Sequence, residues 1–309
     1  MLTHIDLGDE KEIEQIWFKA KEECKKVNKI QNLIISGTFP IDQLNCSWII
    51  DNKAEAELWQ QTKRPQELKF NHGEYLNKYN ISAIQYLAAE LKNKKDSNRA
   101  CWSLIDMDTL INSADNPVPS FLTLQASISD DSKTLSITCY YRALEVGHFL
   151  PINVSEICLV ATELNKEFSY NFEFISIVIH AFNAYLKENF TCLRSAKIDL
   201  FEDNQIAIKI SDPTKSKEWI KEMLDNKKDH LESKIATNGL KNLIKNIRFY
   251  NADRKNDHYS PEFLKALEDV DKSVDDYNHL VSKSSYSSIA ESNYKIIKEK
   301  IEIAIRKLI

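Results

Sequence analysis

Six cysteines are the residues of this sequence best able to act as nucleophiles or metal ligands. They are scattered along the chain, at Cys24, Cys46, Cys101, Cys139, Cys158 and Cys192. Zinc sites and disulfide frameworks usually contain cysteines at short, regular spacing, and no CxxC pair is present. The pattern therefore predicts buried, inert thiols, with neither a metal site nor a set of disulfides.

Phosphate chemistry is restricted by a shortage of glycine, which supplies only 5 of the 309 residues. P-loops and dinucleotide-binding loops need several glycines close together, and neither motif occurs. A phosphate ligand would have to be bound by arginines, whose planar fork of donors matches phosphate oxygens.

The helices that must position such residues are indicated by apolar residues at helical spacing. Helices are predicted over residues 11–27, 55–61 and 81–92, and a buried helix is predicted after Pro151. Beyond Pro213 the chain is rich in Lys, Glu, Asp and Ser. Helical spacing continues there, in segments 219–224, 240–247 and 294–308.

Strands are predicted where β-branched residues stand between turn formers, over residues 32–37 and 47–51. Two alternating runs flank the polar turn Asp130-Asp131-Ser132, which predicts a hairpin. A second hairpin is predicted around Glu202-Asp203-Asn204. The expected fold class is α+β, with a mixed domain over residues 1–212 and a helical region over residues 213–309.

The overall composition is that of a folded globular protein, with 43% hydrophobic and 28% charged residues. A net charge of −5 gives no general attraction to nucleic acid or to anionic membranes. No apolar run is long enough to span a membrane. The first ten residues include Asp6, Asp9 and Glu10, which is unlike a secretory signal, so a cytoplasmic location is expected.

The most specific signal comes from four short segments in the middle of the chain. They are DSNR (96–99), VPSFLTLQ (118–125), YYRALEVGHFLPIN (140–153) and VIHAF (178–182). Their order and spacing resemble the thymidylate synthase superfamily, which includes the deoxyribonucleotide hydroxymethylases. The resemblance spans roughly residues 30–190. It implies a thymidylate-synthase-like mixed sheet with packed helices, and a homodimer that shares residues between its two sites.

The same resemblance implies a site for a pyrimidine deoxynucleotide. Arg142 would hold the phosphate, Asn153 would read the pyrimidine ring, and His180 would contact the ribose hydroxyl. Arg99 occupies the position of an arginine that reaches the partner subunit's site. The matched ligand positions are Arg142, Arg99, Asn153, His180, Gln125 and Tyr75.

The departures from the family concern the chemistry. The family's reaction starts with attack of a cysteine thiolate on the pyrimidine, and Ser120 stands at that position. A serine needs an adjacent base to become a nucleophile, yet the neighbouring histidine of the family is Phe121 here. The tail that closes over folate is replaced by a predicted helix. The standard reaction is therefore not expected, and no catalytic residue is assigned. No cofactor is expected, and the resemblance leaves folate open as the one alternative.

Each matched residue also has a structural interpretation that the sequence leaves open. Arg142 and Arg99 could be surface arginines, Asn153 could cap a helix, and His180 could be a core histidine. Three hypotheses for function follow. The first is a catalytically inactive nucleotide binder with a sensing or complex-forming role, in which the helical region contacts a protein partner. The others are a nucleotide-modifying transferase of altered chemistry and a scaffold with a vestigial pocket.

Overall fold

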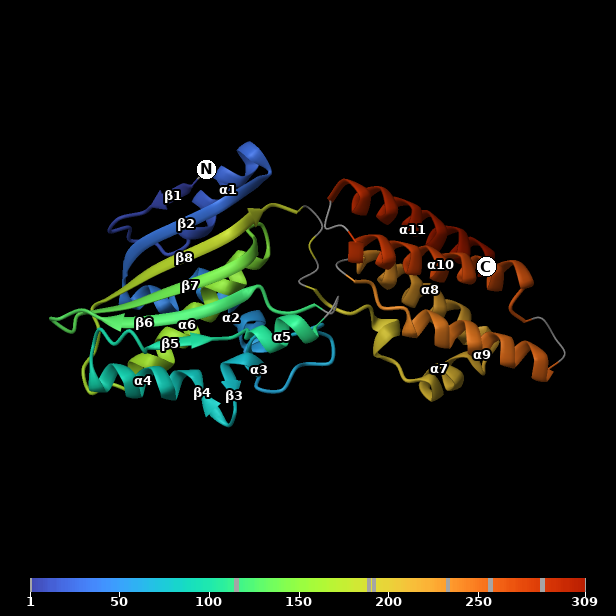
Figure 1. The fold of residues 1–309 in the computed structure, drawn as a ribbon. Helices are drawn as coiled ribbons and strands as arrows, with labels where there is room; N and C mark the ends of the chain where they lie inside the picture. The colour runs from blue at the N-terminus through green and yellow to red at the C-terminus, as the bar shows by residue number, and fades with distance from the viewer. Residues whose placement is uncertain are drawn as a thin grey trace. The chain divides into compact units, whose positions relative to one another are not determined.

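The computed structural model describes residues 2–113, 117–187, 190, 193–231, 234–254, 258–283 and 287–308. These residues form two compact units (Figure 1). The first unit combines a six-stranded mixed sheet with helices. The second unit is helical, and its main segment starts at Leu193. Gln66–Lys69 also belongs to it. The fold class is therefore α+β with a helical C-terminal region, which confirms the prediction.

The large sheet contains both parallel and antiparallel neighbours. β1 is parallel to β2 and β7 is parallel to β8, whereas the other neighbouring pairs are antiparallel. The order across the sheet is β1 (Thr3–Asp6), β2 (Lys29–Pro40), β8 (Phe174–Tyr185), β7 (Thr134–Glu145), β6 (Phe121–Ile128) and β5 (Cys101–Ser103). A second, two-stranded sheet pairs β3 (Asn77–Lys78) with β4 (Ile81–Ser82).

The antiparallel pair β6–β7 confirms the hairpin predicted around residues 130–132. Its turn is stabilised by the Asp131 carboxylate, which accepts hydrogen bonds from the Ser129 hydroxyl (2.6 Å) and the Lys133 amide (3.1 Å). Short polar side chains commonly bond to nearby backbone in this way, and they favour turns over continued strands.

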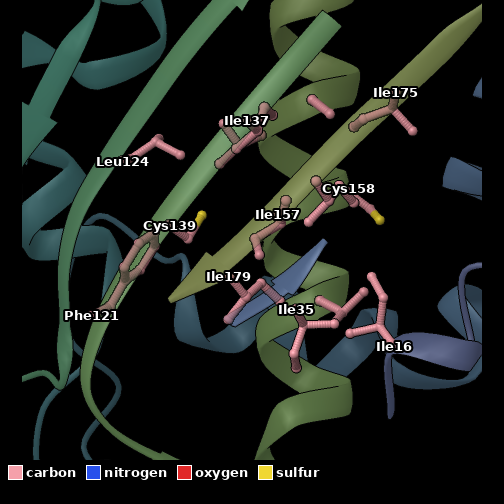
Figure 2. Close-up of a cluster of buried hydrophobic side chains, with 14 of the residues drawn as sticks. Ile16, Ile35, Phe121, Leu124, Ile137, Cys139, Ile157, Cys158, Ile175 and Ile179 are labelled. Carbon is pink, nitrogen blue, oxygen red and sulfur yellow. The ribbon is translucent and has the colours of Figure 1, made fainter. Parts of the chain in front are cut away.

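One face of the sheet, here called the inward face, packs against helices. The helices and the short 3-10 helix of this unit are α1 (Gln15–Val27), η1 (Ile41–Asn45), α2 (Ser47–Trp59), α3 (Gly73–Leu76), α4 (Ala83–Asn93), α5 (Met107–Asn112) and α6 (Phe149–Lys166). In Figure 2, Ile157 and Cys158 of α6 lie beside Ile137 and Ile179 of the central strands. These side chains are at most 1% exposed, and each buried aliphatic side chain of this kind contributes about 1.5–3 kcal/mol.

The opposite, outward face of the sheet contains a local break in the strand pattern. In a regular strand, every second side chain faces inward. In four neighbouring strands this alternation is interrupted once, where two successive residues both face outward. The outward pairs are residues 31–32 of β2, 182–183 of β8, 142–143 of β7 and 122–123 of β6. The pairs of β2, β8 and β7 lie side by side, because the flanking residues are paired across these strands, whereas the pair of β6 lies opposite Tyr140 of β7. We call these eight residues the break row.

The break has local causes in two strands. The β6–β7 register shifts between Phe121 and Thr123, which is a β-bulge. Asn32 of β2 has φ +55°, a conformation that Asn tolerates better than most residues. Bulges bend strands and often lie next to functional sites, so the break row marks a candidate ligand-binding part of the sheet.

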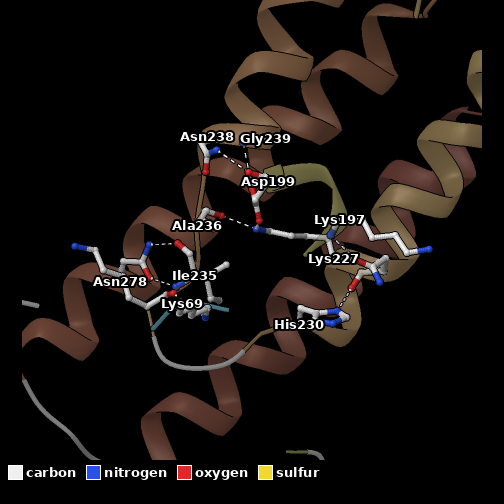
Figure 3. A network of polar contacts seen from close by, with 12 residues as sticks. Lys69, Lys197, Asp199, Lys227, His230, Ile235, Ala236, Asn238, Gly239 and Asn278 are labelled. Carbon is white, nitrogen blue, oxygen red and sulfur yellow. Dashed lines mark hydrogen bonds and ion pairs between the residues drawn. The ribbon is translucent and has the colours of Figure 1, made fainter. Parts of the chain in front are cut away.

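The second unit has a hydrophobic core of its own. Its elements are η2 (Lys197–Leu200), α7 (Asp203–Ile210), α8 (Pro213–Asp229), α9 (Asn238–Arg254), α10 (Pro261–Lys283) and α11 (Ser287–Leu308). A buried ion pair joins Lys227 to Asp199, and the Lys227 ammonium also donates to the Ala236 carbonyl (Figure 3). The helices predicted within residues 219–224, 240–247 and 294–308 are confirmed.

The strand predicted over residues 47–51 is wrong, because these residues begin α2. Ile49, Ala56 and Trp59 are buried at helical spacing, whereas Ile50 is 57% exposed. The residues that follow, rich in Ala, Glu and Leu, favour a helix and continue it.

The second predicted hairpin is also wrong. Glu202 and Gln205 form a reciprocal capping box that starts α7, so the polar triplet at 202–204 is a helix N-terminus. Ile206 and Ile210 are then buried one helical turn apart. The segment 197–210 belongs to the second unit, which therefore starts earlier than the expected boundary after residue 212.

The described cysteines are all free thiols, and three of them (Cys24, Cys139 and Cys158) are buried. Cys101 is exposed, unlike the buried thiol that was predicted, because it lies on the outward face of the edge strand β5. Cys192 lies outside the described residues. Within the described helices, none combines the length and the apolar character needed to cross a membrane.

Candidate functional site

A hollow of about 520 Å³ opens on the outward face of the sheet at the break row. Because two successive residues of each strand face outward there, the hollow receives side chains that regular alternation would turn inward. Its lining includes Tyr140, Arg142, Ala143, His180, Phe182 and Asn183. The strands β7 and β8 thus supply most of the site.

Arg142 is the charged residue of the hollow. It is half-buried, and its Nη2 atom donates to the carbonyls of Val118 (3.3 Å) and Pro119 (3.1 Å). Its Nε atom is buried and has no hydrogen-bond partner. Burial lowers the pKa of the guanidinium from its ordinary value, which is high enough for arginine to remain a cation. The side chain is therefore anchored at one end and has an unused donor for an anion.

Aromatic rings form the rest of the lining. The rings of Tyr140 and His180 meet edge to face with their centroids 5.6 Å apart. They are side by side because the two residues are paired across β7 and β8. Phe182 is 55% exposed. A planar ligand could pack against these surfaces while its anionic group reached Arg142.

Ser120 lies beside Arg142 and is half-buried. Its carbonyl accepts a hydrogen bond from the Arg142 amide at 2.8 Å. In the described part of the chain, no hydrogen bond joins the Ser120 hydroxyl to a basic side chain. Phe121 points to the inward face, where its ring stacks on Tyr141 at 4.7 Å. The arrangement offers no means of activating the serine as a nucleophile.

Asn153 does not line the hollow. It lies in α6 and is 1% exposed, and both polar atoms of its side-chain amide are buried without a partner. The N-terminus of α6 is capped by another residue, Glu145, which accepts hydrogen bonds from the amides of residues 147, 148 and 149. Asn153 is therefore not the helix cap that its sequence position allowed.

The remaining predicted ligand residues lie away from the hollow. Gln125 of β6 is half-buried and is paired with Thr138 of β7, on the far side of Tyr140 from Arg142. Tyr75 lies in α3, half-buried, with its carbonyl bonded to the Trp102 indole at 2.9 Å. Burial raises the pKa of the Tyr75 hydroxyl. The structure thus brings Arg142 and His180 together in the hollow and places Ser120 next to Arg142.

Arg99 follows the C-terminal end of α4 and is exposed. Its carbonyl accepts a hydrogen bond from the Tyr86 hydroxyl at 3.0 Å. Its side chain belongs to the surface of the first unit, which leaves the predicted role across a dimer interface as an expectation.

A buried pair, His72 and Glu156, was not expected from the sequence. Each is 1% exposed, and the His72 Nδ1 atom lies 2.8 and 2.9 Å from the two carboxylate oxygens. Burial raises the pKa of Glu156, and His72 opposes that shift. A glutamate within the apolar stretch of a helix predicted to be buried was the signal for this pair, because buried carboxylates are nearly always paired.

No known protein-family model matches this chain, and no curated protein matches it. In the described residues, no group of three or more His, Cys, Asp or Glu side chains is arranged to hold a metal ion.

Proposed function

We propose that the first unit is a diverged thymidylate-synthase-like domain that binds a pyrimidine deoxynucleotide in a sensing or complex-forming role. The observation that carries the proposal is Arg142, a half-buried cation with a buried, unpartnered Nε donor in a hollow lined by aromatic rings. Phosphate suits the guanidinium, and a flat base or sugar suits the rings.

A non-catalytic role is supported by the surroundings of Ser120. Thiolate chemistry is absent at this position, and the adjacent Phe121 is committed to the core of the sheet. Incubation with deoxyuridylate or deoxycytidylate, with and without methylenetetrahydrofolate, should give no product detectable by mass spectrometry. A product would favour the alternative of a transferase with altered chemistry.

Asn153 is the second element of the proposal. An amide offers both a donor and an acceptor, which is what the edge of a uracil ring requires. Both atoms are buried without partners, and such groups usually find a ligand or an ordered water. Asn153 is buried and does not line the hollow, so an Asn153→Ala variant should leave nucleotide binding unchanged if the hollow alone binds the ligand. Weaker binding by this variant would show that the base is read at Asn153.

Calorimetric titration with a panel of deoxynucleoside monophosphates tests the proposal. Arg142→Ala should weaken binding roughly 10- to 100-fold, because a hydrogen bond to a charged group contributes about 1.5–3 kcal/mol. Arg248→Ala is the matched control, since Arg248 is an exposed arginine of the second unit that pairs with Glu268. If no nucleotide binds and the Arg142→Ala variant functions like the unaltered protein, a scaffold with a vestigial pocket would be favoured instead.

We also propose that the protein is a cytoplasmic homodimer and that its helical unit contacts a protein partner. The dimer is supported by large apolar side chains on the outward face, where Tyr140, Phe174 and Phe182 are 38%, 39% and 55% exposed. Sedimentation equilibrium should show a dimer that Phe182→Glu weakens. A monomer at all accessible concentrations would count against it.

A further inference from the structure

Among the described residues, three that line the hollow have a buried polar atom without a hydrogen-bond partner: Tyr141, Arg142 and Asn183. The ring of Tyr141 stacks on Phe121, whereas Arg142 and Asn183 offer atoms of opposite kinds. The Nε atom of Arg142 is a donor, and the Oδ1 atom of Asn183 is an acceptor. Both residues line the same hollow. Asn183 is not among the positions that the family resemblance assigns to the ligand.

The break row explains how Asn183 reaches this place. Residue 183 is paired with Ala143 of β7, next to Arg142. Along β8, Ile179 and Ala181 face inward, so regular alternation would turn residue 183 inward as well. At the break row both Phe182 and Asn183 face outward, and Ala184 returns to the core. The distortion of the sheet therefore places an amide beside the arginine.

Leaving a buried polar atom unpaired destabilises a folded protein, because the atom loses its bonds to water and gains nothing in return. Native proteins retain few such atoms, and those that persist commonly serve a ligand or an ordered water. A donor and an acceptor in one hollow define complementary chemistry. A ligand in the hollow that paired with both atoms would present an acceptor to Arg142 and a hydrogen-bond donor to Asn183.

We propose that Asn183 is a ligand-contacting residue that selects a phosphorylated ligand with a hydrogen-bond donor near its phosphate. The inference rests on the proposed function for its ligand class. In a pyrimidine deoxynucleotide, the donor is a sugar hydroxyl, the amino group of cytosine or the ring N–H of uracil or thymine. The Asn183 carbonyl oxygen accepts from that group while the phosphate oxygens accept from Arg142.

Stability of the empty protein provides the first test, and it needs no ligand. Asn183→Leu replaces the amide by an apolar group of similar size, and it should raise the melting temperature by about 2–4 °C. Asn278→Leu is the matched control. Asn278 is also half-buried, but its amide bonds to both the amide and the carbonyl of Ile235, so this variant should melt lower (Figure 3). A melting temperature of Asn183→Leu at or below that of the unaltered protein overturns the inference.

Binding provides the second test. Asn183→Leu should weaken deoxycytidylate binding about 2- to 10-fold and leave the affinity for inorganic phosphate unchanged. If the sugar hydroxyl is the donor, the variant and the unaltered protein should bind 2′,3′-dideoxycytidine monophosphate equally. If the base amino group is the donor, they should instead bind deoxyuridylate equally.

The two proposals fail in different ways. Equal affinity of both proteins for deoxycytidylate overturns the role of Asn183 and leaves nucleotide binding in place. A second outcome is that Asn183→Leu raises the melting temperature while the unaltered protein binds phosphate but no nucleotide. That outcome overturns the proposed function and supports Asn183 as part of a site for another phosphorylated ligand.

Discussion

At the scale of single residues, the second unit buries an ion pair in place of an apolar contact. The Lys227 ammonium is 1% exposed and the Asp199 carboxylate 4% exposed. Burial lowers the pKa of Lys227, and Asp199 opposes that shift. Asp199 also accepts a hydrogen bond from the Gly239 amide, so it connects η2 to the start of α9 (Figure 3). The pair therefore fixes how three segments of the unit meet.

Asp199→Ala should lower the free energy of unfolding of the second unit by about 3–5 kcal/mol, because it leaves a buried ammonium uncompensated. The double variant Asp199→Ala with Lys227→Met should recover part of this loss, since no buried charge remains. Urea denaturation followed by circular dichroism measures both values.

The control for this prediction is Asp275→Ala, which breaks the exposed pair with Lys241. About half of each side chain is exposed there, so the change should be at most about 1 kcal/mol. Equal effects of Asp199→Ala and Asp275→Ala would contradict a special role for the buried pair.

At the scale of elements, the start of α6 depends on a single carboxylate. Glu145 is 2% exposed and accepts hydrogen bonds from the amides of Gly147 (2.8 Å), His148 (2.7 Å) and Phe149 (3.0 Å). A negative charge at this end also complements the helix dipole. Because α6 packs along the inward face of the sheet, loss of its first turn would disturb the hydrophobic core of the first unit.

Glu145→Ala should destabilise the first unit by about 2 kcal/mol or more, because the amides of Gly147, His148 and Phe149 lose this acceptor. Glu145→Gln retains an acceptor oxygen without the charge, so it should lower the free energy of unfolding roughly half as much as Glu145→Ala does. Chemical denaturation of the two variants gives these values. A Glu145→Gln variant as unstable as Glu145→Ala would show that charge, rather than hydrogen bonding, dominates the cap.

At the scale of the whole molecule, the two units have separate hydrophobic cores. Each is large enough to unfold cooperatively by itself. Differential scanning calorimetry should therefore resolve two transitions. Asp199→Ala should lower only one of them and Glu145→Ala only the other. A single transition that both variants shift would show that the units unfold as one.

Much of the fold follows from local pattern. The hairpin of β6 and β7 was predictable because alternating runs flank a turn whose side chains bond to the nearby backbone. The helix over residues 83–93 was predictable because its apolar residues recur at helical spacing, which is also a local property of the sequence. Residues 47–51 were mistaken for a strand, and the residues around Glu202-Asp203-Asn204 were mistaken for a hairpin. A short run of β-branched residues does not reveal whether its neighbours will continue a helix.

Some features of the candidate site were likewise predictable from the sequence, and others were not. The sequence by itself determined that a phosphate would need an arginine, and the motifs singled out Arg142 and His180, which the fold does bring together. Only the tertiary structure decided that Asn153 is enclosed by the core and that Asn183 faces the hollow. The side of the sheet to which residue 183 points depends on a break shared by four strands. Such a break arises from pairing between distant segments, and no single segment encodes it.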